Sequence, residues 1–401
     1  MSQNSLRVAI RKYDPFEAAI RQAWESFVKT ERVELTLDAV QMDLDPLHKT
    51  IFDEQSADVV FFVTDWFATA KESGVLLDLA PLIKATPPSG WPAAWPKSLL
   101  GMQQFGDAIY GLPYHDGPEC FIYRRDLFDD PAEQAAYRAN YGSDLRVPTT
   151  WQEFHQVAQF FTRPEQNLYG TVFAAFPDGH NTVYDFCIQL WTRGGELFDA
   201  NQRMQLDTPQ AIDALKFYRA ILNDQSAIHP KAREFDSVKS GLSFLAGEIA
   251  MMVNWFGFAT LCDTSPDSGI KGKVNIAPIP ASAGGKPLSL SVYWTLSIMA
   301  NSPHKELAYR FIRHCMEAEQ DKFLTLAGAI GCRTSTWHDA EVNAQIPYYH
   351  RLSTLHENAR ELPRLAHWDD LAKIIDELVV RVISTDDPIE QIVKTMQAKV
   401  P

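Results

Sequence analysis

Three short segments contain residue types that could support catalysis or metal binding, and each lacks part of the pattern that the chemistry needs. Residues 283–287 (AGGKP) have the glycines and lysine of a phosphate-binding loop, but Pro287 replaces the hydroxyl that would bind magnesium. Residues 356–358 (HEN) are not followed by the second histidine of a zinc-protease helix. His115 and Asp116 could ligate a metal, but no other histidine or carboxylate lies at a supporting spacing. We expect a hydrogen-bonding role for this pair, at a hinge or in a pocket.

Covalent and acid–base catalysis receive no better support. The chain has neither a G-x-G-x-x-G segment after a strand nor a G-x-S-x-G nucleophile turn. A glycosidase needs two carboxylates about 5–9.5 Å apart. Among 51 acidic residues some pair will meet that condition by chance, so a carbohydrate-active enzyme stays open as an unsupported alternative. We expect no enzyme activity, no cofactor and no bound metal.

The cysteine pattern also gives no support for a metal site. The chain has five cysteines without a C-x-x-C pair, and an odd number excludes complete internal pairing. We predict buried free thiols that pack as small apolar groups, with a single disulfide as the alternative.

Length and charge restrict the class of protein. A chain of 401 residues is too long for one ordinary core, so two lobes are expected. The net charge is −14, from 37 basic and 51 acidic residues. Phosphate binding needs a basic surface, so nucleic acid is excluded as a partner. A strongly negative chain is expected to be soluble and monomeric, and no segment approaches the roughly 18 apolar residues of a membrane helix.

The first third of the sequence alternates short apolar strands with amphipathic segments. Strands are predicted at 6–10, 33–37 and 59–63, the last buried on both faces. Helices are predicted near 16–27, 47–52 and 65–73, with Gly74 as a C-terminal stop. This order predicts an α/β lobe with a mainly parallel sheet.

The composition changes after Tyr110. Residues 111–118 (GLPYHDGP) combine prolines and glycines with polar residues before a strand at 120–123, and we interpret them as a first crossing between lobes. Thr150 and Glu153 form a capping box at a helix start. Thr208-Pro209, Ser302-Pro303 and Asp387-Pro388 predict further helix starts with proline in the first turn, and another helix should follow Asp369.

Several segments together resemble a known family. They share an order and spacing along nearly the whole chain and are 148–154 (PTTWQEF), 194–199 (GGELFD), 244–251 (FLAGEIAM), 278–280 (PIP), 293–298 (YWTLSI) and 302–308 (SPHKELA). In that order they resemble the carbohydrate-binding subunits of ABC importers, the family that includes maltose-binding protein. Each segment alone is weakly specific, and the shared order carries the resemblance.

The resemblance implies a two-lobed, type II periplasmic-binding-protein fold of the α/β class. Residues 1–113 and 285–328 would form the N-terminal lobe, and residues 114–284 and 329–401 the C-terminal lobe. The ligand, a small saccharide, would lie between lobes that close by hinge motion and deliver it to the transmembrane subunits of an ABC permease. The resemblance implies a periplasmic or cell-surface location. An expected strand already begins at residue 6 and leaves no room for a secretory leader, so either the leader was removed or the protein stays in the cytoplasm.

A sugar pocket needs flat aromatic rings against the C–H faces of the sugar, with carboxylates, amides or guanidinium groups around its hydroxyls. Open α/β sheets place ligands at the ends of strands. Eight residues in four groups meet that condition, and they are Tyr13, Asp14, Asp65, Trp66, Asn254, Trp255, His367 and Trp368.

The resemblance adds further binding candidates, which are Tyr114, Asp116, Tyr184, Tyr293 and Trp294. Arg364 lies near these positions, although solvated surface charge is its simpler role. An acidic ligand, such as a uronic or sulfonated sugar, or a solute that is not a sugar, is the alternative if guanidinium groups enter the pocket. Four tryptophans are assigned to structure, and they are Trp24, Trp151, Trp191 and Trp337.

Overall fold

The computed structural model describes residues 4–401, which divide into two compact units. Within the described residues, unit 1 consists of 4–118, 291–357 and 361–366, and unit 2 consists of 119–290, 358–360 and 367–401. The sequence placed 329–357 in the second lobe, whereas these residues lie in unit 1. The chain first passes from one unit to the other at 118–119 and again at 290–291, which is five or six residues after the predicted boundaries.

Unit 1 is built on a five-stranded sheet with the order β2-β1-β3-β12-β6. Its strands are β1 (Ser5–Arg11), β2 (Thr36–Met42), β3 (Val59–Val63), β6 (Leu112–His115) and β12 (Trp294–Ile298). β1 is parallel to β2 and to β3, while β12 is antiparallel to β3 and β6. The prediction of a parallel sheet is therefore right for the first three strands, and the late strand β12 enters the sheet in the opposite direction.

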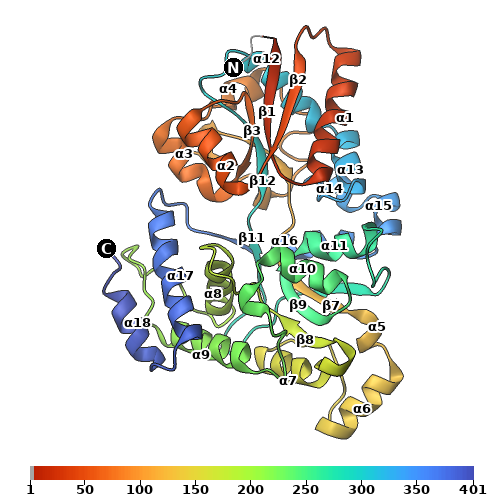
Figure 1. Ribbon diagram of the computed structural model, residues 1–401. Helices are drawn as coiled ribbons and strands as arrows, with labels where there is room; N and C mark the ends of the chain where they lie inside the picture. The colour runs from red at the N-terminus through yellow and green to blue at the C-terminus, as the bar shows by residue number, and fades with distance from the viewer. Residues whose placement is uncertain (1–3) are drawn as a thin grey trace. The chain divides into compact units, whose positions relative to one another are not determined.

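Helices lie on both faces of this sheet (Figure 1). α1 packs on α12 and α13, whereas α2 and α3 lie across the sheet from α1. The helices of unit 1 are α1 (Asp14–Thr30), α2 (Leu44–Lys49), α3 (Phe67–Ser73), α4 (Ala80–Ala85), α12 (Lys305–Cys315), α13 (Ala318–Leu326), α14 (Thr334–Trp337), α15 (Ala340–Gln345) and α16 (Leu352–Glu357). A small hairpin of β4 (Gln104–Phe105) and β5 (Ala108–Ile109) completes the unit.

Unit 2 is built on a four-stranded sheet with the order β10-β7-β9-β8. The strands are β7 (Glu119–Arg124), β8 (Tyr169–Val172), β9 (Ile249–Trp255) and β10 (Val274–Ala277). β9 is parallel to β8 and antiparallel to β7. Two further short strands, β11 (Ser289–Ser291) and β13 (Ala359–Glu361), pair with each other. The chain passes from one unit to the other within each of these two strands.

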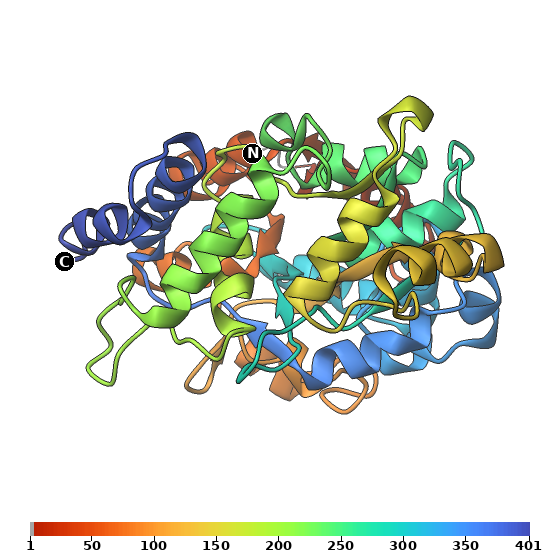
Figure 2. The ribbon, with the colours of Figure 1, turned by 90° about the horizontal axis from the view of Figure 1, so that it is seen from below.

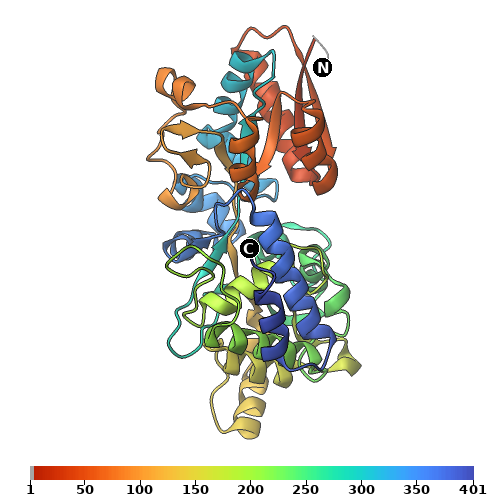
Figure 3. The ribbon, with the colours of Figure 1, turned by 90° about the vertical axis from the view of Figure 1, so that its left-hand side faces the viewer.

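The helices of unit 2 form two groups. α7 packs on β8 and β9, and α10 and α11 pack on each other and on β9, while α8, α9, α17 and α18 form a helical layer in which α17 contacts the other three. Figure 3 shows α17 and α18 side by side. The bounds are α5 (Arg125–Phe128), α6 (Pro131–Tyr141), α7 (Trp151–Phe161), α8 (Asn181–Trp191), α9 (Pro209–Asn223), α10 (Ser237–Leu245), α11 (Phe256–Thr264), α17 (Trp368–Ser384) and α18 (Ile389–Gln397).

The helix boundaries show which local signals decided the structure. The capping box at Thr150 is present in full, and Thr208 caps α9 with Pro209 in its first turn. Gly74 ends α3 in the left-handed conformation with φ +66, as predicted. The other two proline signals were misplaced, because α12 is capped by His304 and Pro388 is itself the cap of α18.

Two early elements also differ from the prediction. The strand expected at 33–37 is β2, Thr36–Met42, an edge strand whose mixed burial weakens the alternation on which the prediction relied. The helix expected at 47–52 begins earlier, at Leu44, and continues after Lys49 as a π-helix over Thr50–Glu54. Among residues 4–401, no helix combines the length and the apolar character needed to cross a bilayer.

Candidate functional site

One edge of the sheet in unit 1 carries most of the predicted binding residues of that unit. β1, β3 and β6 end at the edge where β12 begins, because Trp294 pairs with Val63 on one side and with His115 on the other. Tyr13 follows β1 and Trp66 follows β3. Strand topology therefore brings together residues that are almost 300 positions apart in the sequence.

Trp66 and Trp294 form the aromatic part of this edge. Their rings meet edge to face, with centroids 6.4 Å apart and an interplanar angle of 79°. Trp66 is 7% exposed and also contacts His48 and Phe62, whereas Trp294 is half-buried. Asp65, between β3 and Trp66, is half-buried. Trp294 is thus the more accessible of the two rings.

Tyr13 and Asp14 begin α1 beside the same edge. The Tyr13 hydroxyl donates to the Gly328 carbonyl oxygen over 2.8 Å, and its ring contacts Phe16 edge to face. Burial and the nearby Asp14 carboxylate raise the pKa of Tyr13 to about 12, so the hydroxyl stays a hydrogen-bond donor at physiological pH. Asp14 is exposed and accepts a hydrogen bond from Gln41.

The structure places Tyr114 and Tyr293 in the core of unit 1. Tyr293 is fully buried, and its hydroxyl donates to Gln103 Oε1 over 2.5 Å while accepting from the Met102 N–H. Tyr114 is 3% exposed and packs edge to face on Phe61. Both rings pack within the unit, so their proposed contact with a ligand gains no support from this placement.

Asp116 also has a structural partner. Its carboxylate oxygen Oδ2 accepts from His356 Nε2 over 2.7 Å, and Ser98 Oγ lies 2.8 Å from Nδ1 of the same ring. The His356 side chain is 3% exposed, the Asp116 side chain is fully buried, and Trp337 stacks on the imidazole. The hydrogen-bonding role predicted for Asp116 is present, but the carboxylate binds a protein group rather than facing solvent.

His115, the other member of the predicted pair, accepts a hydrogen bond from the Ile330 N–H through Nδ1. Burial lowers the pKa of His115 to about 4, so the ring is neutral at physiological pH. No group of three or more histidine, cysteine, aspartate or glutamate side chains within residues 4–401 is arranged to hold a metal ion.

Arg364 lies on the surface of unit 1. Its Nη1 donates to the carbonyl oxygens of Gly101 and Gln104, and the guanidinium lies over the Phe105 ring. These contacts hold the arginine against the loop and hairpin of residues 101–109. The simpler role that the sequence favoured, an exposed surface charge, agrees with this geometry.

A second set of predicted residues gathers at an edge of the sheet in unit 2. β9 ends at Trp255, and its antiparallel partner β7 begins opposite it at Glu119. Tyr184, on α8, meets the Trp255 ring edge to face at 5.7 Å with an interplanar angle of 87°. Asn254 is buried and donates to the Ser237 carbonyl oxygen, so its amide is bonded to the first residue of α10. Trp255 is half-buried and, with Tyr184, forms an aromatic corner.

Two buried carboxyl groups beside this corner were missed from the sequence. Glu119 is 4% exposed and Asp185, on α8, is 7% exposed. Burial raises the pKa of Asp185 to about 7, and burial together with the Asp185 charge raises the pKa of Glu119 well above its usual value. The available signal was an acid at the start of an otherwise apolar strand and another within the apolar helix 181–191.

The remaining predicted pair begins α17. His367 is the exposed cap residue of this helix, and Trp368, its first residue, is 4% exposed. α17 packs against α8, the helix that carries Tyr184. The prediction that Trp368 stacks on a ligand stays a prediction.

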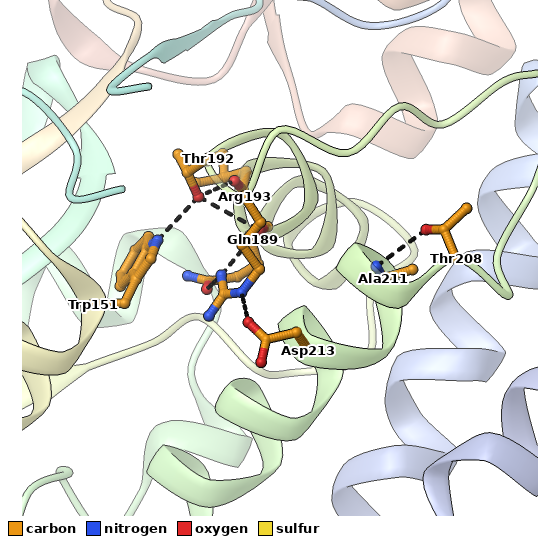
Figure 4. A network of polar contacts seen from close by, with 8 residues as sticks. Trp151, Gln189, Thr192, Arg193, Thr208, Ala211 and Asp213 are labelled. Atoms are coloured by element: carbon orange, nitrogen blue, oxygen red, sulfur yellow. Dashed lines mark hydrogen bonds and ion pairs between the residues drawn. The ribbon is translucent and has the colours of Figure 1, made fainter. Parts of the chain in front are cut away.

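A surface hollow of about 690 Å³ lies between α7 and α9 of unit 2, and Figure 2 shows these two helices next to each other. Its basic groups are already paired with acids. Arg193 donates to Asp213 Oδ2 over 2.7 Å and to Gln189, as Figure 4 shows. Lys216 pairs with Glu390, and His155 with Asp224. These ion pairs balance the positive charges of the hollow with negative ones. None of the predicted binding residues lines the hollow.

The structural tryptophans and the cysteines were predicted correctly. Trp24, Trp151, Trp191 and Trp337 are all at least nine-tenths buried. All five cysteines are free and buried. The alternative of a disulfide is therefore wrong.

Comparison with known proteins identifies the family. The family of bacterial extracellular solute-binding proteins matches residues 49–322, more than half of the chain. The chain therefore belongs to the bacterial extracellular solute-binding protein family, as the sequence motifs indicated.

Individual relatives are distant. A probable ABC transporter-binding protein of Deinococcus radiodurans is 23% identical over 290 residues, which is 71% of this chain and 66% of the relative. An arabinooligosaccharide-binding protein of Halalkalibacterium halodurans is 24% identical over 256 residues, which is 60% of this chain and 51% of the relative. The chain therefore covers less than two thirds of the length of these two relatives.

Solved structures show the same fold over nearly the full length. A solute-binding protein of an ABC transporter from Agrobacterium radiobacter, in complex with ribitol, has a TM-score of 0.85 at 23% identity, covering 100% of this chain and 98% of that one. Maltose-bound MalE3 of T. maritima has a TM-score of 0.84 at 21% identity, covering 98% and 99%. The fold is thus the two-lobed α/β fold predicted from the sequence.

Proposed function

We propose that this chain is the solute-binding subunit of an ABC transporter and that it captures a small saccharide or polyol for delivery to a membrane permease. The observation that carries the proposal is the presence, at a sheet edge in each unit, of accessible aromatic rings next to polar groups. Half-buried Trp294 lies at such an edge in unit 1, and half-buried Trp255 lies at the edge in unit 2, where the buried Tyr184 ring packs against it. Aromatic rings can cover the C–H faces of a sugar while neighbouring polar groups bind its hydroxyls.

The relatives support the class of solute. One relative is an arabinooligosaccharide-binding protein, and similar structures hold ribitol and maltose. Capture needs no bond to be broken, and hydrogen bonds to the correct solute exclude wrong ones, which would leave buried polar groups unpaired. An extracytoplasmic location and a monomeric state complete the proposal, in keeping with the family description and the net charge of −14.

A thermal-shift screen of monosaccharides, oligosaccharides and polyols tests this function. A bound solute stabilises the folded chain by about 2.7 kcal/mol at a hundredfold excess over its Kd. We expect at least one member of the panel to raise the melting temperature in a concentration-dependent way, with a Kd then obtained by calorimetry. A complete panel without any shift would contradict the proposal.

Variants locate the solute. Trp255→Ala and Trp294→Ala each remove a half-buried ring at a sheet edge, and we expect each to weaken binding by about tenfold or more. Trp91→Ala is the matched control, because Trp91 is also half-buried but lies in the proline-rich loop 87–96. Weakening by either edge variant would support a role in binding for the sheet edge of the unit that carries it. If both variants fold normally and neither weakens binding, the solute does not bind at these sheet edges.

A further inference from the structure

Glu119 is a buried acid without a protein partner for its carboxyl group. The residue is 4% exposed, and no hydrogen bond or ion pair to its side chain is found within residues 4–401. Buried polar groups in folded proteins are normally hydrogen-bonded, and a buried charge without a partner is costly. The Glu119 oxygens are not among the fully enclosed atoms without a partner, so a carboxyl group that is mostly buried next to a predicted binding surface stays open to a partner from outside the chain.

Glu119 belongs to a group of acids in unit 2. Its nearest charged neighbour is Asp185 on α8, which in turn interacts with Asp178 in the segment before that helix. Tyr218, from α9, donates its hydroxyl to Asp185 Oδ2 over 2.5 Å. The three carboxyl groups are thus electrostatically coupled, and Asp178 accepts hydrogen bonds from Asn181, whereas Asp185 receives the neutral Tyr218 hydroxyl as its donor.

Basic side chains do not compensate this group. Within residues 4–401, no ion pair between a lysine or arginine and Glu119 or Asp185 is found, and no basic residue is a cause of their pKa shifts. His180 is the nearby basic residue, and its Nδ1 contacts the backbone oxygen of Asp178 rather than a carboxylate. The contrast with the hollow of the same unit is clear, because Arg193 there has Asp213 as a direct partner.

Aromatic rings complete the environment of Glu119. Trp255 lies directly across the strand pair from Glu119, and Tyr184 precedes Asp185 on α8 and contacts the Trp255 ring. Carboxylates bind ammonium groups through charge-assisted hydrogen bonds, and the faces of Trp and Tyr attract the same cations. An anionic ligand would meet only repulsion here.

We propose that the solute of this protein is an amino-bearing polyhydroxy compound, an amino sugar or amino polyol, whose ammonium group binds the Glu119 carboxylate. This inference rests on the proposed function and specifies its solute class. It also replaces the acidic ligand that the sequence left open as an alternative, since the buried charges near the aromatic corner are negative.

Matched pairs of ligands test the inference separately from the function. Glucosamine with glucose, galactosamine with galactose, and 1-amino-1-deoxysorbitol with sorbitol differ only by an amino group in place of a hydroxyl, and each can be titrated by calorimetry at pH 6.5, where the amines are charged. We expect the amino member of at least one pair to bind on the order of tenfold more tightly than its parent. Parents that bind as well as or better than their amino partners would overturn the inference and leave the proposed function intact. Absence of binding by all six, together with a silent saccharide panel, would remove both.

The variant Glu119→Gln assigns the effect to a residue. We expect it to bring the affinities of the amino compound and its parent to within about twofold of each other, because the amide keeps the shape and loses the charge. Glu165→Gln is the matched control, since Glu165 is an exposed acid of the same unit. A preference that survives in Glu119→Gln would show that the ammonium is bound elsewhere.

The unmodified chain offers an independent measurement. The pKa of Asp185, raised by burial to about 7, keeps part of this carboxyl group protonated near pH 7, and burial raises the pKa of Glu119 as well. Binding of an ammonium group favours their ionised forms, so protons are released. Calorimetry in two buffers of different ionisation enthalpy should show release with the amino compound and none with its parent. Equal proton exchange by both members would contradict the inference without any variant.

Discussion

Asp116 and Glu119 are three positions apart in the sequence, both are buried, and they have opposite surroundings. Asp116, in unit 1, accepts a hydrogen bond from His356 over 2.7 Å, and a stacked tryptophan holds that histidine in place. Glu119, in unit 2, has another carboxyl as its charged neighbour and no protein donor within the described chain. The first acid stabilises the fold, whereas the second is available to a ligand.

The difference teaches how to distinguish structural from functional acids. Burial alone does not separate the two, since their exposed fractions are 2% and 4%. The donors to the two carboxyl groups do separate them, because His356 donates to Asp116 Oδ2, although Asp116 Oδ1 has no partner, whereas no donor to the Glu119 carboxyl group is found within the described residues. Stability measurements on variants of the two acids can confirm or break this distinction.

The largest effect is expected from Asp116→Ala. Removing the carboxylate leaves the buried His356 ring without its acceptor, and loss of one partner of a buried pair costs about 3–5 kcal/mol. Urea unfolding should show a loss of this size. His356→Ala should cost a similar amount, and the double variant should cost much less than the sum. A loss below about 1 kcal/mol for Asp116→Ala would show that the pair does not stabilise unit 1.

A pH-dependent effect is expected for Asp185. Its pKa in the folded chain is raised to about 7, against about 3.9 when unfolded, so the folded state binds the proton more tightly. The stability from this group is complete below about pH 4 and is lost as the pH rises to about 7, at up to about 1 kcal/mol per pH unit. Asp185→Asn should remove that slope from the free energy of unfolding measured between pH 4 and 8. An unchanged slope would mean that Asp185 is ionised throughout.

A smaller change of opposite sign is expected from Glu119→Gln. The amide removes an ionisable group that burial disfavours, so at pH 8 the variant should be as stable as the parent chain or more stable by up to about 1 kcal/mol. The measurement is urea unfolding without ligand. A clear destabilisation would place Glu119 with Asp116, as an acid that the fold requires.

The smallest effect is expected at an exposed ion pair. Lys373 and Asp370 are about three-quarters exposed and 3.2 Å apart on α17. Solvent screens such a pair, so Lys373→Ala should change the free energy of unfolding by less than about 0.5 kcal/mol. This variant gives the baseline for the others. A larger effect would show that the unfolding measurement responds to changes unrelated to burial.

The fold was predictable where the local chemistry is strong. The apolar run 59–63 is β3, and Thr150 with Glu153 begins α7, because a buried strand and a capping box depend on neighbours in sequence. The edge strand β2 was misplaced because its exposed face gives a weak pattern. The assignment of 329–357 to the second lobe failed for a different reason, since which unit a segment joins depends on contacts distant in sequence.

The predicted binding residues also divide into positions that the sequence could place and surroundings that it could not. Strand ends predicted the positions of Trp66 and Trp255 at sheet edges, and the family resemblance added Trp294. The same reasoning could not tell that Tyr293 would be fully buried with its hydroxyl bonded to Gln103. Glu119 was missed because its importance comes from the absence of a partner, and no local sequence pattern reveals such an absence.

The five buried thiols have a practical consequence for measuring motion. Burial raises the pKa of Cys187 to about 12 and those of the other four thiols further still, so the reactive thiolate is scarce and shielded at neutral pH. Maleimide dyes should therefore ignore the natural cysteines. One cysteine introduced at exposed Lys84 and another at exposed Asn201 give each unit its own fluorescent reporter, and energy transfer between the dyes can then follow solute capture in real time.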